Sequence, residues 1–358
     1  GEVAVGGGGG GDESWKRFED TTTVARLLQS GVSLKTAEEF TAAFAASGPN
    51  KWVNPPGDVF WLRGKKYLED RQKYQSIPCY FPLIGCDLWK VVPTIEGGPG
   101  PQRCIGRHPQ NYVQKVLRNP QIDPVVAAQV EAGGDVHIFV MNFLLPFGNF
   151  VGYWLRPWHP DSDDDHTPTP QSEPLAGDLS DSDNEMGSAA PGGESGDGKI
   201  GGYKKMTASD KLTRSLYDAF ISGDDDYRNA RLKVSPRVFA GPWLVKRAVG
   251  KGNKAAKLGE QIPLSYDRGP NHFEVMVDVS SSALGNRILS VVTTYIKAVT
   301  IDLGFIIEGT TEEELPERVL GALRFYALEV EDAPFLPPMN FDNSQPQEQE
   351  PEPEKEAP

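Results

Sequence analysis

Cysteine is scarce in this sequence: only Cys79, Cys86 and Cys104 occur among 358 residues. An odd and small number of cysteines does not build a disulfide framework, so the count favours a reducing compartment. Histidine is also scarce, with five residues. The local motifs of serine hydrolases, zinc peptidases, phosphate-binding loops and dithiol redox sites are all missing. We therefore predict that the protein is not an enzyme, has no catalytic residue and binds no cofactor.

One set of residues has the right chemistry for zinc. Cys79, Cys86, Cys104 and His108 would provide four ligands, with six, seventeen and three residues between them. Structural zinc sites normally have two pairs of ligands with short spacings, and the spacings of these four residues do not follow that pattern. Cys79 and Cys86 lie in an apolar run, where a free cysteine is a small core residue. The sequence therefore predicts no metal site.

A long uncharged apolar run is missing as well. The longest apolar stretch, Ile288–Ile307, contains Lys297 and Asp302 near its middle. Either charge would be costly at the centre of a bilayer. We expect this stretch to be a buried helix.

The net charge of −14 comes from two segments. Residues 161–198 carry eleven acids and no Lys or Arg, and residues 342–358 carry six acids and one Lys. The rest of the chain has 35 basic and 33 acidic residues, without the concentrated basic footprint that nucleic-acid binding needs. Segments this poor in apolar residues do not fold. We expect disorder in residues 1–14, which are rich in Gly, in an acidic linker at 161–199 and in a tail at 341–358. Residues 15–340 would then form one interrupted domain, expected to be a monomer.

Apolar periodicity predicts an α+β fold. Strands are expected around Val59–Arg63, Tyr80–Trp89, Arg231–Phe239, Gln261–Tyr266 and Phe273–Val279, and a hairpin from Val136–Leu145 and Phe150–Trp158. Helices are expected at Thr22–Ser30, from Thr36 to Gly48, at Ser209–Ser222, at Asn286–Leu303 and at Glu312–Leu328. This order predicts a mostly antiparallel curved sheet gripping a long C-terminal helix, after two N-terminal helices. The plan is similar to the helix-grip domains that transfer lipids, and such a grip either packs solid or leaves a ligand-sized cavity.

Two segments are candidates for function. The first is a basic stretch without acids that follows Trp243 and consists of Lys246, Arg247, Lys251, Lys254 and Lys257. Cations beside an aromatic side chain suit anionic lipid headgroups, although a solvated loop is the plainer interpretation. The second contains Ser180 and Ser182, each with an acid three residues on. This spacing suits acidophilic kinases, whose phosphate would add to the negative charge, and an inert linker is the alternative.

Two further residues are predicted to be structural. Trp243 follows Gly241-Pro242 at the start of an apolar segment that we interpret as a strand, so its ring should be buried. Asp278 ends an apolar strand just before Ser280–Ser282, so it should be buried and its carboxylate should accept hydrogen bonds from them.

Five runs of the sequence together resemble the Enhanced Disease Resistance 2 C-terminal family. They are Phe60–Asp70, Gly241–Lys246, Phe273–Ser282, Asp302–Gly309 and Glu314–Gly321. The resemblance implies that both halves of the chain belong to one domain. In larger plant members this domain often follows a pleckstrin-homology and a START lipid-binding domain, in proteins that act in defence and cell-death signalling at membranes. It implies no established catalytic residue.

These observations lead to one functional expectation with two alternatives. We expect a non-enzymatic regulatory domain, cytoplasmic or peripheral at a membrane, that binds lipid or an anionic membrane surface. One alternative is a protein-interaction module that recruits partners through its acidic insert and tail. The other is an uncharacterised lipid-modifying enzyme.

Overall fold

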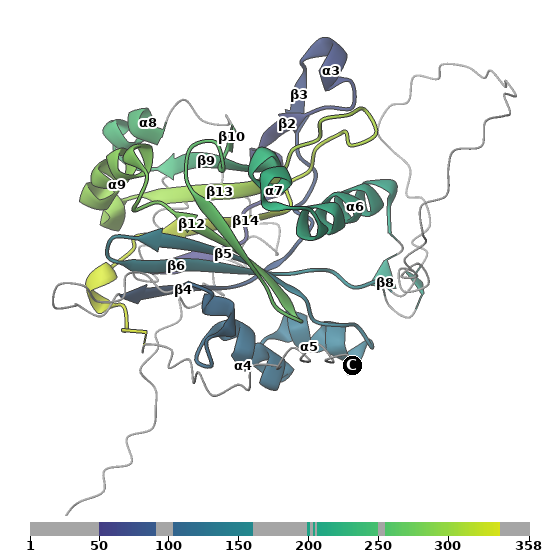
Figure 1. The fold of residues 1–358 in the computed structure, drawn as a ribbon, viewed down its shortest axis with the longest axis horizontal. Helices are drawn as coiled ribbons and strands as arrows, with labels where there is room; N and C mark the ends of the chain where they lie inside the picture. The colour runs from purple at the N-terminus through teal and green to yellow at the C-terminus, as the bar shows by residue number, and fades with distance from the viewer. Residues whose placement is uncertain are drawn as a thin grey trace, which may run out of the picture.

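The computed structural model describes residues 50–90, 103–159, 199–200, 203–204, 206–249 and 255–336. Within this part of the chain, ten strands form two five-stranded sheets that lie against each other (Figure 1). The first sheet consists of β1 (Lys51–Val53), β14 (Gly321–Tyr326), β13 (Thr300–Ile307), β9 (Leu232–Ala240) and β10 (Ala256–Lys257), in that order. The second consists of β11 (Leu264–Arg268), β12 (His272–Asp278), β5 (Ile138–Leu145), β6 (Gly148–Leu155) and β4 (Leu83–Lys90).

Both sheets combine strands from the two sides of the acidic linker. In the first sheet β1 pairs antiparallel with β14, and in the second β5 pairs parallel with β12. The other ladders of these two sheets are antiparallel. The fold is therefore α+β with mostly antiparallel sheets, and the halves of the chain form a common core.

Aromatic side chains fill the space between the two sheets. The ring of Trp154 on β6 lies 5.3 Å from that of Phe305 on β13, and Phe150 lies 5.2 Å from Phe325. The indole Nε1 of Trp154 also donates to the carbonyl oxygen of Ala322 at 3.1 Å, so that its one polar atom is satisfied. Buried aromatic rings of this size contribute strongly to a core, and here they join the two sheets.

Helices cover one face of the second sheet and close one side of the space between the two sheets. On the second sheet, α4 (Tyr112–Arg118) and α5 (Pro124–Glu131) pack their apolar faces against β5 and β6. Helix α6 (Ala208–Ser222) begins with a capping box between Thr207 and Asp210, and its Tyr217 packs on Phe81 and Phe139. It is followed by α7 (Asp225–Arg231).

Two smaller groups of elements stand out in Figure 1. A hairpin of β2 (Trp61–Arg63) and β3 (Lys73–Gln75), with α3 (Tyr67–Asp70) between them, projects from the sheets. At one end of the molecule α8 (Trp243–Val249) contacts α9 (Ala283–Tyr295). The remaining elements are β7 (Lys199–Ile200), β8 (Tyr203–Lys204) and the 3₁₀ turns η1 (Gly57–Val59), η2 (Ile105–Arg107), η3 (Pro120–Ile122), η5 (Ile296–Ala298) and η6 (Val330–Asp332).

Several predicted elements are confirmed. The hairpin is β5 and β6, which pair from Ile138 with Leu155 to Leu145 with Gly148. The turn is tighter than predicted, because Gly148 already pairs with Leu145. Gly148 has a φ of 155°, and a Cβ at this position would lie 1.8 Å from the carbonyl oxygen of Trp89. The helix at 208–222 and the strands β4, β9, β11 and β12 also match their predicted positions within a few residues.

The predicted helix Asn286–Leu303 is wrong in its second half. Helix α9 ends at Tyr295, and Thr300–Ile307 is a strand in the middle of the first sheet. The apolar run spanned two elements, so its length did not indicate a single helix. The β-branched residues of the second half favour a strand that is buried on both faces.

The predicted helix Glu312–Leu328 is also wrong, and the structure contains no long C-terminal helix in the residues it describes. Here the chain runs without helix to the strand β14. A Cβ at Gly321 would lie 2.7 Å from the indole of Trp154, so this position packs against the opposite sheet. Residues 321–325 are all buried, which hides the alternation by which a strand is recognised.

Other predictions fall outside the described residues. They include the helices Thr22–Ser30 and Thr36 to Gly48, the acidic linker and the acidic tail. Among the helices that the structure describes, none has the length and apolarity needed to cross a bilayer.

Candidate functional site

Helix α8 carries an exposed tryptophan. Strand β9 ends at Ala240, and Gly241 (φ 149°) turns the chain into the helix, where Val245 N donates to the Pro242 carbonyl oxygen at 3.1 Å. Trp243 is 69% exposed, whereas Val245 is fully buried. The predicted burial of Trp243 in a strand is therefore wrong: Gly241-Pro242 starts a helical turn that points the ring outward.

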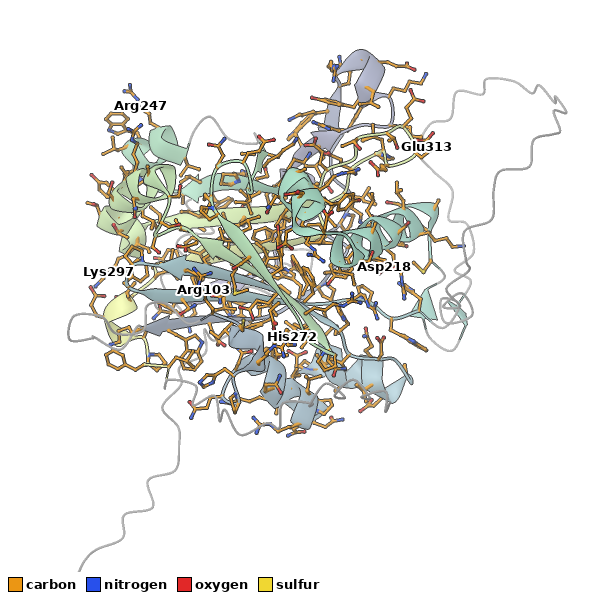
Figure 2. All side chains as sticks on the ribbon, viewed as in Figure 1. Arg103, Asp218, Arg247, His272, Lys297 and Glu313 are labelled. Carbon is orange, nitrogen blue, oxygen red and sulfur yellow. The ribbon has the colours of Figure 1, made fainter. Side chains whose placement is uncertain are left out.

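Three neighbours of Trp243 complete a surface that we call the α8 face: Leu244, Lys246 and Arg247. Leu244 is 38% exposed, and both cations are exposed. Neither cation has a carboxylate within ion-pair distance among the residues that the structure describes. Figure 2 labels Arg247 at the outer end of the molecule. The α8 face thus combines one large ring, one aliphatic side chain and two positive charges in a single helical turn.

The structure divides the other basic residues of the predicted segment. Lys257 lies on β10 and pairs with Glu260 at 3.2 Å and Glu308 at 3.6 Å. Its charge is therefore largely compensated, unlike those of the α8 face. Lys251 and Lys254 fall outside the described residues, as do the predicted phosphorylation sites Ser180 and Ser182.

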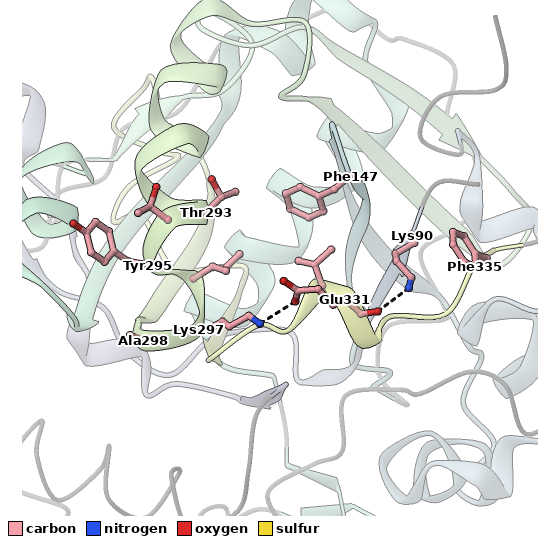
Figure 3. A pocket seen from close by; sticks show the side chains of 11 residues that line it. Lys90, Phe147, Thr293, Tyr295, Lys297, Ala298, Glu331 and Phe335 are labelled. Atoms are coloured by element: carbon pink, nitrogen blue, oxygen red, sulfur yellow. Dashed lines mark hydrogen bonds and ion pairs between the residues drawn. The ribbon is translucent and has the colours of Figure 1, made fainter. Parts of the chain in front are cut away.

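A groove of about 590 Å³ lies beside the C-terminal end of α9 (Figure 3). We call it the α9 groove. Its apolar walls include Phe147, Ile296, Val330 and Phe335, and two lysines stand at its rim. Lys90 Nζ donates to the carbonyl oxygen of Glu331 at 2.7 Å, and Lys297 Nζ pairs with the carboxylate of the same residue at 3.1 Å. These rim residues lie far apart in the chain, so no local sequence pattern indicated them.

A second set of charges lies buried behind the β2–β3 hairpin. The ammonium group of Lys233 hydrogen-bonds Glu317 and lies 3.4 Å from Glu308, and the guanidinium of Arg63 lies 3.3 Å from Glu308. Glu317 also accepts hydrogen bonds from the backbone N–H groups of Arg63 and Gly309. Burial lowers the pKa of Lys233, and the Glu317 carboxylate opposes that shift. These contacts satisfy the buried charges and fasten the hairpin to β9 and to the loop between β13 and β14.

Glu274 on β12 holds the turn η2 against the second sheet. Its buried carboxylate accepts hydrogen bonds from Ile105 N at 3.1 Å, Gly106 N at 2.8 Å and the Asn142 amide at 2.8 Å. Next to it, Arg107 binds Asp267 through two hydrogen bonds of 2.6 and 2.7 Å. All of these oxygens therefore have donors already.

The same region contains the three side chains whose spacing would allow a metal ion: Asp267, His272 and Glu274. The bidentate Arg107 on Asp267 places a positive charge where a cation would sit, so the donor set does not suit a metal. The set of Cys79, Cys86, Cys104 and His108, which the sequence analysis rejected as a zinc site, is not among the metal-ligand clusters of the described residues. Among the described residues neither Cys79 nor Cys86 forms a disulfide, and burial raises the pKa of Cys79 to about 12.

Glu274 should make stability depend on pH. Burial raises its pKa from 4.5 to about 7, against the opposing effect of its three hydrogen bonds. A folded protein loses stability as a buried acid with a raised pKa ionises. The contribution of Glu274 to the free energy of unfolding should therefore fall between about pH 4.5 and pH 7. The slope is at most about 1.4 kcal/mol per pH unit. Burial lowers the pKa of His137 and His272 in the folded state. Below about pH 6.5 their contribution to the free energy of unfolding should therefore rise with pH, opposite to that of Glu274.

The comparison with Glu274→Gln isolates this contribution. The amide cannot ionise and loses one acceptor, so we expect the variant to be less stable at pH 5 and to recover about 2–3 kcal/mol relative to the wild type by pH 8. Urea unfolding at four pH values between 5 and 8 measures the difference. A constant difference across this range would contradict the raised pKa.

Asp278 was predicted to be buried and to accept local hydrogen bonds. The hydrogen bonds are confirmed: its carboxylate accepts from Ser280 Oγ at 2.9 Å and Ser281 N at 3.1 Å. Its side chain is 18% exposed, so it is only partly buried, and Arg103 pairs with it from the surface at 2.8 Å. These contacts lower its pKa against the effect of desolvation.

The comparison with known protein families shows to which family this chain is related. The family described as Protein ENHANCED DISEASE RESISTANCE 2, C-terminal, matches residues 52–329. This chain belongs to that family. A relative in Arabidopsis thaliana named Protein ENHANCED DISEASE RESISTANCE 2-like is 39% identical over 119 residues, which is 33% of this chain and 16% of the relative. The matched part is thus a small share of that longer protein. No solved structure matches the chain.

Three of the five sequence runs that resemble the Enhanced Disease Resistance 2 C-terminal family meet in the described structure. Arg63 comes from the first run, Glu308 from the run Asp302–Gly309, and Glu317 from Glu314–Gly321, and all three lie in the buried charge cluster. The run Gly241–Lys246 forms the start of α8, and Glu274 lies in Phe273–Ser282. These residues are up to about 250 positions apart, so their spacing along the chain could not indicate that they lie together. The one available signal was that each of them lies in a run that resembles the family.

Proposed function

We propose that this Enhanced Disease Resistance 2 C-terminal domain docks on anionic membrane surfaces through its α8 face. The observation that supports the proposal is the exposure of Trp243 beside Lys246 and Arg247. Tryptophan prefers the membrane interface because its ring is apolar and its N–H can still reach water. Lysine and arginine next to it attract the acidic headgroups of the cytoplasmic leaflet.

The domain would act as a regulatory module and not as an enzyme. Its relative is named for disease resistance in a plant, and we propose a role in defence signalling at the cytoplasmic face of a membrane. The two-sheet core gives the α8 face a rigid base, because α8 packs on α9 and buries Val245. A short exposed helix on such a base can enter a headgroup layer without unfolding.

Removing the ring tests the proposal. Trp243→Ala should weaken binding to vesicles of phosphatidylcholine with 30% phosphatidylserine roughly tenfold, the loss expected when about 1.4 kcal/mol of apolar contact disappears. Its thermal midpoint should not change, because the ring buries little in the free protein. Co-sedimentation with vesicles and thermal unfolding measure the two quantities.

Trp61→Ala is the matched control. Trp61 is 44% exposed, but it lies on the β2–β3 hairpin and not on α8. We expect this variant to bind vesicles like the wild type. Equal losses for both tryptophans, or no loss for Trp243→Ala, would contradict docking through α8.

A further inference from the structure

We infer that the α9 groove binds a single anionic phospholipid, with its phosphate between Lys90 and Lys297 and an acyl chain along the apolar wall. This inference rests on the proposed function, because the lipid would come from the membrane on which α8 docks. The groove has about 590 Å³, within the size range of sites for small ligands. Its apolar side chains come from the turn between β5 and β6, from η5 and from the segment that follows β14.

The position of an anion is already marked by Glu331. Its carbonyl oxygen and its carboxylate take up the ammonium groups of Lys90 and Lys297, respectively, as the dashed lines in Figure 3 show. Lys90 is also held 4.7 Å above the ring of Phe335, a cation–π contact that keeps its charge at the rim. The charge of Lys90 also acts on the Glu331 carboxylate that pairs with Lys297. Two positive charges thus lie near one anion beside an apolar surface, which is the arrangement that an amphiphilic anion requires.

The internal anion can be replaced at small cost. The side chains of Glu331 and Lys297 are 71% and 55% exposed, so water and salt weaken their attraction. A lipid phosphate offers more acceptor oxygens than one carboxylate and forms stronger charge-assisted hydrogen bonds. Its acyl chain would in addition cover Phe147, Val330 and the exposed Phe335, which is 47% accessible in the free protein.

The groove and the α8 face belong to the same end of the molecule. Helix α8 contacts α9, and the groove is lined by the last turn of α9 and by η5. Figure 2 labels Arg247 and Lys297 at that end. A membrane that touches α8 would therefore bring lipid headgroups close to the two lysines.

Titration with a soluble short-chain lipid tests the groove without any membrane. Dihexanoyl phosphatidic acid, below the concentration at which it forms micelles, should bind the full chain saturably in isothermal titration calorimetry. Glycerol 3-phosphate, which lacks the chains, and dihexanoyl phosphatidylcholine, whose choline compensates the phosphate, should both bind at least tenfold more weakly. Equal binding of glycerol 3-phosphate would show a phosphate site and would overturn the lipid assignment.

Variants at the rim give effects of opposite sign. Lys90→Gln with Lys297→Gln should weaken binding of the short-chain lipid at least tenfold, whereas Glu331→Gln should strengthen it about threefold by removing the competing charge. Lys211→Gln, at an exposed position on α6, should change nothing. The absence of saturable binding, or binding that the double variant retains or that Glu331→Gln weakens, would overturn the inference.

The failure of this inference can be told apart from the failure of membrane docking. Lys246→Glu with Arg247→Glu should leave the affinity for dihexanoyl phosphatidic acid unchanged, because the α8 face does not line the groove. A wild-type protein that binds vesicles but not the soluble lipid contradicts the lipid site in the groove and leaves membrane docking intact. Binding of the soluble lipid without binding to vesicles contradicts membrane docking through α8 and leaves the lipid site in the groove intact.

Discussion

Reversing both charges of the α8 face, Lys246→Glu with Arg247→Glu, should weaken binding to vesicles with 30% phosphatidylserine by at least a hundredfold. Each cation near such a surface contributes about 1 kcal/mol, and replacing it by an acid turns this attraction into a repulsion of similar size. The total for two residues is about 4 kcal/mol before screening, and each 1.4 kcal/mol is a factor of ten. Both side chains are exposed, so the fold should remain intact.

Salt and a matched double variant provide the controls. The affinity of the wild type should fall as salt shortens the screening length from about 10 Å at 0.1 M to about 3 Å at 1 M. Lys66→Glu with Lys211→Glu makes the same change in net charge at exposed positions near α3 and on α6. If this control loses as much affinity as the α8 variant, binding depends on the overall charge and not on the α8 face.

The largest loss of stability is expected from Glu317→Ala. Glu317 is buried and accepts hydrogen bonds from Lys233 Nζ and from the backbone N–H groups of Arg63 and Gly309. Its removal leaves the buried ammonium of Lys233 with only the more distant Glu308, at 3.4 Å. Leaving a buried charge without its partner typically costs about 3–5 kcal/mol. Urea unfolding should show the free energy of unfolding reduced by this amount.

A second substitution separates the charge from the lost packing. Lys233→Met in the Glu317→Ala background removes the uncompensated charge and should restore at least half of the lost stability, since an apolar side chain can replace a buried ion pair at little cost. Glu313→Ala, on the same loop but exposed, should leave stability unchanged. If the Lys233→Met double variant is no more stable than Glu317→Ala, the charge of Lys233 does not determine the loss.

The buried charge cluster also explains why the hairpin around α3 keeps its orientation. Arg63 Nη1 donates to the carbonyl oxygen of Gly309 at 2.9 Å, and Lys65 Nζ donates to that of Leu315 at 3.0 Å. These contacts join the start of the described chain to a loop about 250 residues further on. The projecting hairpin is therefore bonded to the loop between β13 and β14 of the first sheet.

The sequence by itself determined the elements whose pattern is local. The two runs of the β5–β6 hairpin are rich in Val, Phe, Trp and Tyr around a short turn, and α6 has both a capping box and an amphipathic face. Each could therefore be predicted without knowledge of its neighbours. The family relationship was likewise readable from short runs, and the match over residues 52–329 confirms it. The same holds for the hydrogen bonds of Asp278, whose donors follow directly in the chain.

Tertiary structure alone decided the elements and sites that depend on distant partners. Thr300–Ile307 and Gly321–Tyr326 are strands because they pair with each other and with β9 and β1 in the first sheet. Both of their faces are buried, which erases the periodicity that separates strand from helix. Trp243 is exposed because Val245, and not the ring, faces the core after the turn at Gly241. The charge cluster and the α9 groove join residues far apart in the chain, and only the folding of the two sheets brings their charges within reach.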